Sequence, residues 1–288
     1  MEDLILRKGE IENDFFKVFF KENNYSKVTI RVSGGADSAM ALYLLAMFAE
    51  QENPDLEIYA FTAVDALMLT GDDAFGKAEE CAKDVVKFVK EKFPEIKIEH
   101  TIEYFTRVEF ANKKFAAWGK HPNLKIGKNA TIRPLLEKHI LDTGSEIVIS
   151  GTTKNIHPSL RESYDDLKSY PGTDYTRKKV RYFSAFGTDD HRDSDEGVTK
   201  LQDTTLFGKN ATGKPQIVPW GTVDKTFVGA QYEKYNLIDT LLPLTESCIY
   251  SPYMVEGKDY PFKKAPCKVC YWCNERYYTF GSFDYGEK

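Results

Sequence analysis

Residues 28–38 constrain the fold of this chain more than any other stretch. A short run rich in β-branched residues, Val28 to Val32, ends in Ser-Gly-Gly-Ala-Asp-Ser at positions 33–38, which we call the glycine loop. A good helix-forming sequence follows at once, from Ala39 to Glu50. This order predicts a strand, a sharp turn and the start of a helix. Adjacent glycines allow close backbone approach to a ligand, and the free N–H groups of a helix N-terminus favour a phosphate there.

The glycine loop matches one known phosphate-binding pattern and differs from two others. It lacks the Gly-Lys-Ser/Thr ending of a Walker A loop and the three-glycine spacing of dinucleotide-binding turns. It resembles the PP-loop of the N-type ATP pyrophosphatases, which split ATP between its α and β phosphates and adenylate a substrate oxygen. This resemblance implies that ATP phosphates contact Ser33, Gly34, Gly35, Asp37 and Ser38, with Mg²⁺ between the phosphates and the Asp37 carboxylate. The alternative is a strand–helix turn that Ser38 caps and that binds no ligand.

Strands and helices alternate along much of the rest of the chain. Apolar runs predict strands at 58–64, 96–102 and 146–150 and a short strand end at 217–219, and helical periodicity predicts helices at 10–22, 78–93, 108–118, 134–143 and 225–235. The alternation predicts an α/β fold, a Rossmann-like parallel sheet with helices on both faces. Since ligands bind at the carboxyl ends of such strands, residues 151–155 should lie beside the glycine loop.

The composition and net charge of the chain exclude some classes of protein. The chain has 288 residues, 42% of them hydrophobic, and a formal net charge of −5, so we expect a real core and no surface that coats nucleic acid. Binding of RNA or DNA through a local patch, and a homodimer, stay open. No apolar run of about 18 residues and no signal peptide is visible, so we expect a cytoplasmic protein without a membrane span.

We expect two regions in the chain. Residues 1–218 would form the nucleotide-binding α/β domain, with a polar insertion at about 165–215, and residues 219–288 a helical, zinc-binding region. The insertion is interpreted as a solvated excursion because charged residues replace apolar runs there, as in the acidic segment 189–196.

Four of the five cysteines predict a metal site near the C-terminus. Cys267, Cys270 and Cys273 are spaced by two residues each, and Cys248 lies upstream of them. Four thiolates can complete a tetrahedral zinc site with no open position, so the metal would be structural. The same spacing also suits an iron–sulfur cluster, which stays an alternative. Cys81, alone in a predicted helix, is interpreted as a small core residue.

The two ends of the chain together resemble the 7-cyano-7-deazaguanine synthase family. That family has a PP-loop near its N-terminus and a tail with Ser-Cys, then Cys-x-x-Cys-x-x-Cys, then an Arg three residues on. Pro219 and Lys225 resemble the family's proline-ending strand and the lysine that opens the next helix, and Arg161 resembles the arginine of its mid-chain motif. The tail residues that match are Ser247, Cys248, Cys267, Cys270, Cys273 and Arg276.

The resemblance implies a reaction and a set of catalytic residues. The family uses ATP and ammonia to convert 7-carboxy-7-deazaguanine to 7-cyano-7-deazaguanine through an adenylated intermediate. Asp37 and Ser38 would act with ATP and Mg²⁺, Lys225 would stabilise transition-state charge, and Arg161 would bind the substrate carboxylate. The alternatives are an exposed helix-start lysine at 225 and an ordinary salt bridge at 161.

Departures from the family leave the acceptor open. The gap of 18 residues between Cys248 and Cys267 is longer than the family's, and Ser159 and Leu160 replace its mid-chain Asp-Cys. Two further hypotheses therefore remain. One is a PP-loop enzyme that adenylates another carboxylate, a tRNA base or a protein terminus; the other is a non-catalytic nucleotide-binding zinc module.

Overall fold

The computed structural model describes residues 20, 24–65, 77–105, 128–153, 212–220, 225–247 and 271–283. The helix predicted at 108–118, nearly all of the helix predicted at 10–22 and most of the predicted insertion lie outside these described residues. Everything below concerns the described ranges.

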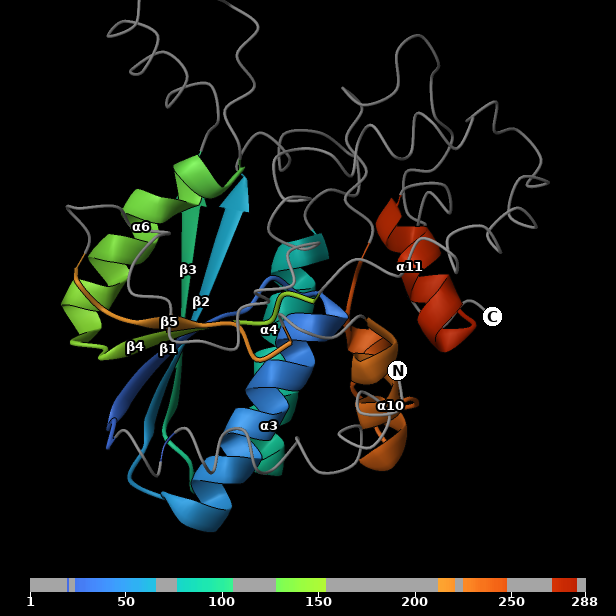
Figure 1. Cartoon of the computed structure of the whole chain (residues 1–288), viewed down its shortest axis with the longest axis horizontal. Coiled ribbons are helices and arrows are strands. Elements are labelled where there is room, and N and C mark those ends of the chain that lie inside the picture. Colours follow the sequence, from blue (N-terminus) through green and yellow to red (C-terminus); the bar gives the residue numbers. More distant parts are fainter. Residues whose placement is uncertain are drawn as a thin grey trace, which may run out of the picture.

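A five-stranded, fully parallel sheet forms the centre of the protein, with strand order β3-β2-β1-β4-β5 (Figure 1). The strands are β1 Lys27–Arg31, β2 Glu57–Asp65, β3 Ile98–Phe105, β4 Ile147–Ser150 and β5 Gln216–Ile217. The chain runs outward from β1 through β2 to β3 and then returns to the other side of β1 as β4. The order therefore reverses between β1 and β4, and ligands of such sheets bind beyond the strand ends at this switch point.

Helices cover both faces of the sheet, which confirms the predicted α/β fold. Helices α3 (Ala36–Glu52) and α4 (Lys77–Lys92) lie on one face, and α6 (Lys128–Thr143) lies on the other (Figure 1). The predicted starts of two helices were too late. Helix α3 begins directly after Gly35 because Ala36, Asp37 and Ser38 form its first turn, and α6 continues through Pro134, at the cost of one backbone hydrogen bond.

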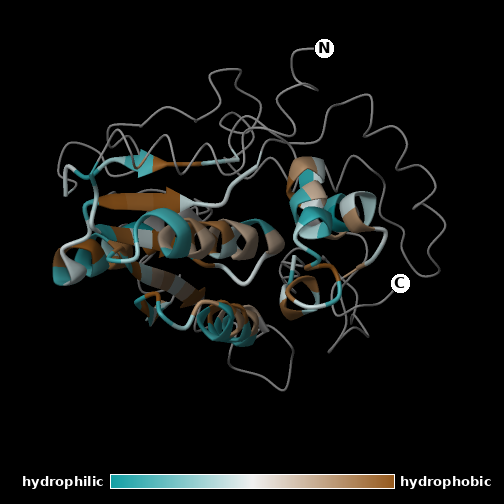
Figure 2. Cartoon of the chain, turned by 90° about the horizontal axis from the view of Figure 1, so that it is seen from below, coloured by the Kyte–Doolittle hydropathy of each residue, from teal (hydrophilic) through white to brown (hydrophobic). Residues whose placement is uncertain are grey.

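The core has two parts, one on each face of the sheet. The larger part joins β1, β2 and β4 to α3 and α4, and the smaller packs Phe61 and Val148 against Ile132, Leu136 and Ile140 of α6. Figure 2 shows hydrophobic residues along much of the central strands and both hydrophobic and hydrophilic residues on the helices around them. Cys81 is 4% exposed in α4, as predicted for a core residue.

The C-terminal elements pack beside α3 and α4, away from the sheet (Figure 1). They are α10 (Lys225–Lys234), a short 3-10 helix η4 (Leu242–Leu244) and α11 (Tyr271–Phe280). Phe227, Val228 and Tyr232 of α10 join the larger core. Within the described ranges, no helix is both long and apolar enough to cross a membrane. The division into regions at residue 218 stays a prediction.

Candidate functional site

The glycine loop joins the end of β1 to the first turn of α3, as its sequence predicts. Gly34 has a φ of +78°, and a Cβ there would lie 2.7 Å from the carbonyl oxygen of Ala78 in α4. Only glycine satisfies both the left-handed backbone and this contact. Gly35 is the N-cap of α3 and carries no side-chain cap, so the helix N-terminus remains open to an external acceptor of hydrogen bonds.

The two serines of the glycine loop interact with each other. The Ser38 hydroxyl donates to the carbonyl of Gly35 over 3.0 Å and accepts a hydrogen bond from the Ser33 N–H over 3.1 Å. The hydroxyl oxygens of Ser33 and Ser38 are 3.2 Å apart. Ser38 is buried and Ser33 is exposed. In this arrangement Ser38 shapes the turn, while Ser33 stays accessible at the surface.

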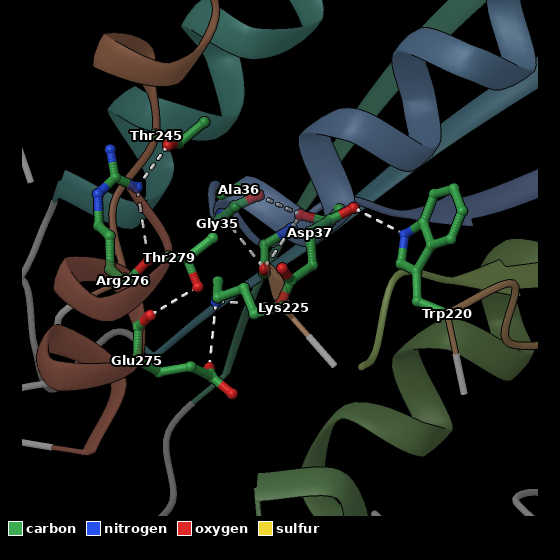
Figure 3. Close-up of polar contacts among 12 residues, drawn as sticks. Gly35, Ala36, Asp37, Trp220, Lys225, Thr245, Glu275, Arg276 and Thr279 are labelled. Carbon is green, nitrogen blue, oxygen red and sulfur yellow. Dashed lines mark hydrogen bonds and ion pairs between the residues drawn. The ribbon is translucent and has the colours of Figure 1, made fainter. Parts of the chain in front are cut away.

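Lys225 is a buried cation of the site and not an exposed helix-start lysine. It is 3% exposed, and its Nζ lies 3.2 Å from Asp37 Oδ2 and 3.3 Å from Glu275 Oε2. Figure 3 shows Lys225 between the first turn of α3 and helix α11. The structure therefore brings two predicted catalytic residues, 188 positions apart in the sequence, into direct contact.

Glu275 is a site residue that the sequence analysis missed. It is 1% exposed, and its carboxylate is the second partner of Lys225. Nothing marks this glutamate in the sequence except its place between Cys273 and Arg276, since its partner comes from a different helix. A buried lysine paired with two carboxylates is held in one position.

Two aromatic side chains from the C-terminal part of the chain donate hydrogen bonds to the first turn of α3. The Trp220 indole N–H donates to the carbonyl of Asp37 over 3.2 Å, and the Tyr232 hydroxyl donates to the carbonyl of Ala36 over 2.9 Å. Both side chains are buried. Sequence reasoning noted Pro219 but neither aromatic residue, because buried aromatic residues are common in any core.

The loop after β4 lies against the same turn, as expected for residues 151–155, of which 151–153 are described. A Cβ on Gly151 would lie 2.7 Å from the Asp37 carbonyl oxygen and 2.8 Å from the Ser38 Cα. Ser150 and Thr152 place their hydroxyl oxygens 3.4 Å apart at this edge. The switch point between β1 and β4 is therefore lined by the glycine loop on one side and by hydroxyl groups on the other.

Arg276, part of the matched tail pattern, has a structural position. Its guanidinium donates to Thr245 Oγ1 over 2.8 Å and to the Leu242 carbonyl over 3.0 Å, and it is 1% exposed. The backbone N–H of Glu246, next to this segment, donates to the Gly34 carbonyl over 2.8 Å. Arg276 thus fixes the segment that supports the back of the glycine loop.

A second chain of hydrogen bonds supports the loop from the sheet. The Thr62 hydroxyl donates to the carbonyl of Val32 over 2.7 Å and lies 2.8 Å from His100 Nε2. Because the single hydroxyl proton of Thr62 points to Val32, His100 must donate through Nε2–H. Burial, with a smaller effect of Lys83 and Lys90, lowers the pKa of His100 to about 4, so the ring is neutral at pH 7.

The predicted metal ligands are only partly described. Cys273 is buried in α11, whereas Cys248, Cys267 and Cys270 lie outside the described residues, as does Arg161. Among the described residues, no group of three or more His, Cys, Asp or Glu side chains could hold a metal ion. The zinc site, the iron–sulfur alternative and the role of Arg161 stay predictions.

Comparison with known proteins finds similar solved structures but no similar sequence. No protein-family model and no curated protein matches the chain. Among the solved structures that resemble it, three share 15% identity with it: an NMN synthetase from Francisella tularensis (TM-score 0.46, 94% of this chain and 83% of that chain), an NAD+ synthetase from Burkholderia pseudomallei (0.43, 96% and 81%) and a U34-tRNA thiolase from Methanococcus maripaludis with its [4Fe-4S] cluster (0.43, 91% and 70%). These TM-scores are below 0.5, so the functional reading rests on the site itself.

Proposed function

We propose that this chain is an ATP pyrophosphatase of the PP-loop type, which adenylates an oxygen of an acceptor and releases pyrophosphate. One observation carries the proposal. The Ser-Gly-Gly-Ala-Asp-Ser loop lies at the switch point of a parallel sheet, and a buried lysine from a distant helix contacts its aspartate at 3.2 Å. The loop and the lysine together place backbone N–H donors and a cation where the phosphates of ATP would bind.

The residues present fit ATP and Mg²⁺. The open N-terminus of α3 and its partial positive charge suit the phosphates, and the two glycines allow their close approach. Asp37 is 19% exposed in its side chain and supplies the carboxylate oxygen that a hard cation prefers. Bound Mg²⁺ would neutralise phosphate charge. The protein's own contribution is the fixed array of N–H groups and Lys225.

The chemistry follows from where these charges lie. An acceptor carboxylate oxygen attacks the α-phosphorus, the bond from that phosphorus to the bridging oxygen breaks, and pyrophosphate leaves. Lys225 lies where it can stabilise the negative charge that develops on the phosphate oxygens. Asp37 and Glu275 keep its ammonium group in place, which lowers the reorganisation that the step requires.

As the acceptor we propose 7-carboxy-7-deazaguanine, with ammonia as the second substrate. A carboxylate is a poor electrophile, and adenylation gives it a good leaving group, AMP. Ammonia then attacks the carbonyl carbon and displaces AMP to give an amide. A second ATP adenylates the amide oxygen with release of pyrophosphate, and AMP then leaves with that oxygen while the nitrogen loses its two protons, which gives the nitrile. The motifs at 33–38 and in the cysteine tail support this choice, and Arg161 is proposed to bind the substrate carboxylate.

The test is product analysis with purified protein, ATP, Mg²⁺, ammonia and 7-carboxy-7-deazaguanine. We expect AMP, pyrophosphate and 7-cyano-7-deazaguanine by mass spectrometry, and loss of all three in Asp37→Ala. ADP and phosphate as the sole nucleotide products would refute the pyrophosphatase reaction. AMP formation that depends on a different carboxylate, tRNA or peptide would keep the reaction class and replace the acceptor.

We also propose that the cysteine tail binds one structural Zn²⁺ through Cys248, Cys267, Cys270 and Cys273. Cys273 begins the turn of α11 that carries Glu275, so the metal would anchor the helix that positions Lys225. Elemental analysis of protein purified without added metal should give one zinc per chain, and Cys270→Ser should lose it. Iron with labile sulfide would instead identify an iron–sulfur cluster.

A further inference from the structure

Arg31, at the carboxyl end of β1, has a position that the proposed roles do not use. In the parallel register Arg31 pairs with Phe61 of β2 and with Ser150 of β4. Arg31 and Ser150 are the last residues of β1 and β4, so both lie at the switch point. Sequence reasoning treated it only as part of the first strand. Yet a cation here lies two residues before Ser33, at the edge of the sheet where the ligand is expected.

Strand alternation places Arg31 on the face opposite to Lys225. Ile30 and Val32 belong to the core that packs on α3, so Arg31 between them faces the other side. Its neighbour Phe61 belongs to the smaller core beneath α6. The two cations therefore lie on opposite faces near the carboxyl edge of the sheet: Lys225, in α10 packed on α3, on the α3 side, and Arg31 on the α6 side.

Arg31 differs from Lys225 in its partners. Across the described parts of the chain, the Arg31 guanidinium makes no hydrogen bond and no ion pair, and burial alone lowers its pKa from the ordinary value. Part of its surface remains exposed. A partly desolvated charge that has no partner among the described residues is unfavourable within that part of the chain, where an apolar residue beside Phe61 would cost less. An arginine in this position can bind an anion that arrives from outside.

The surroundings of Arg31 suit a carboxylate. Ser150 lies beside it in the register and approaches Thr152, whose side chain is exposed. A guanidinium binds a carboxylate through two parallel hydrogen bonds, and neighbouring hydroxyls can donate further ones. The ATP phosphates already have the helix N-terminus and Lys225 on the α3 side, which leaves Arg31 for the other substrate.

We infer that Arg31 binds an anionic group of the acceptor, its carboxylate, at the switch point between β1 and β4. This inference rests on the proposed function, since it requires an acceptor that meets ATP at this edge. Arg31 would hold the acceptor on the α6 side while the α-phosphorus lies on the α3 side. Acceptor and nucleotide would then meet over the ends of β1 and β4.

The test compares Arg31→Leu, Arg31→Lys and a control, Lys27→Leu. Lys27 lies on the same strand and face as Arg31 but at the amino end, where it pairs with Glu57 at 3.9 Å. The readouts are the KM for 7-carboxy-7-deazaguanine and for ATP in the AMP-formation assay, and the melting temperature. If that acceptor is inactive, a panel of carboxylates in ATP–pyrophosphate exchange supplies the one to use.

We expect Arg31→Leu to raise the KM of the acceptor about ten- to a hundredfold, the range of a charged hydrogen-bonded contact. The KM of ATP should be unchanged, and the melting temperature should not fall, because leucine removes a partly desolvated charge. Arg31→Lys should recover part of the loss in acceptor binding, and Lys27→Leu should behave as wild type. A raised KM for ATP alone would identify a phosphate ligand and overturn the inference, as would an unchanged acceptor KM. Wild-type protein that shows no carboxylate-dependent exchange would overturn the proposed acceptor class and this inference together.

Discussion

The glycine loop is held from two sides by different forces. On the sheet side, apolar residues of β1, α3 and α4 pack in one core, and the backbone of Gly34 lies close to α4. Helix α3 is buried along most of its length. On the C-terminal side, α10 and α11 contact the same turn through buried polar groups, above all Lys225 and Glu275. Apolar packing tolerates substitutions of similar volume, whereas a buried ionic network fails when one partner is lost. The apolar contacts of the loop should therefore tolerate exchanges of similar volume, whereas the position of its lysine should be lost when one ionic partner is removed.

The largest effect should come from breaking the ionic side. Lys225→Met removes the ammonium group that lies 3.3 Å from the carboxylate of Glu275, a side chain that is 1% exposed, and we expect a loss of about 3–5 kcal/mol in the free energy of unfolding. Urea denaturation measures the loss. Lys234→Met, an exposed lysine at the other end of α10, is the matched control and should change little. If Glu275→Gln in the Lys225→Met background recovers no stability, the network does not hold the two helices together.

The sheet side is best tested at Gly34. Gly34→Ala combines a φ of +78° with a Cβ 2.7 Å from a backbone oxygen of α4, so we expect a loss of about 2–4 kcal/mol. Gly144→Ala separates the two causes, because Gly144 has a φ of +68° and nothing within 4 Å of the added Cβ. It should lose only about 1–2 kcal/mol in the same denaturation experiment. Equal losses would show that α4 does not press on the loop.

The pH dependence should reveal the hydrogen-bond chain behind the loop. The pKa of His100 is about 4 in the folded protein, below its ordinary value of 6.5, chiefly because of burial. The unfolded chain therefore binds the proton first, so this stability is fully present above pH 6.5 and is lost as the pH falls towards 4. We expect about 1–2 kcal/mol, reduced for the solvent that still reaches the ring.

His100→Gln is the variant that isolates this effect, because its side-chain N–H can still donate to Thr62 and does not titrate. The difference in unfolding free energy between wild type and variant should shrink or reverse between pH 6.5 and pH 4. Wild-type and variant curves that stay parallel over this interval would contradict the buried neutral imidazole.

The smallest effect is a single neutral hydrogen bond. Tyr232→Phe removes the donor to the Ala36 carbonyl at 2.9 Å and keeps the buried ring, so we expect a loss of about 1 kcal/mol. Tyr277→Phe, at a residue that is 37% exposed, is the control and should be neutral. A loss equal to that of Lys225→Met would remove the distinction between neutral and ionic contacts to the first turn of α3.

The sequence by itself determined the sheet side of this protein. Alternation of β-branched runs with helical periodicity predicted β1 to β4 and their parallel arrangement, because each element buries a continuous apolar face. The glycine loop was predicted at the right strand–helix junction, since neighbouring residues alone produce that turn. Helix starts were less accurate because first-turn residues such as Ala36 and Ser38 are compatible with either turn or helix.

Only the tertiary structure decided which distant residues complete the site. From the sequence, Lys225 could be either a catalytic residue or an exposed helix-start lysine. Glu275 and Trp220 were not recognised as site residues. Arg31 looked like any strand residue until the register placed it at the switch point beside Ser150. Local patterns encode which residues are buried. Which buried charges meet depends on how helices far apart in the sequence pack, and neither residue spacing nor composition specifies that.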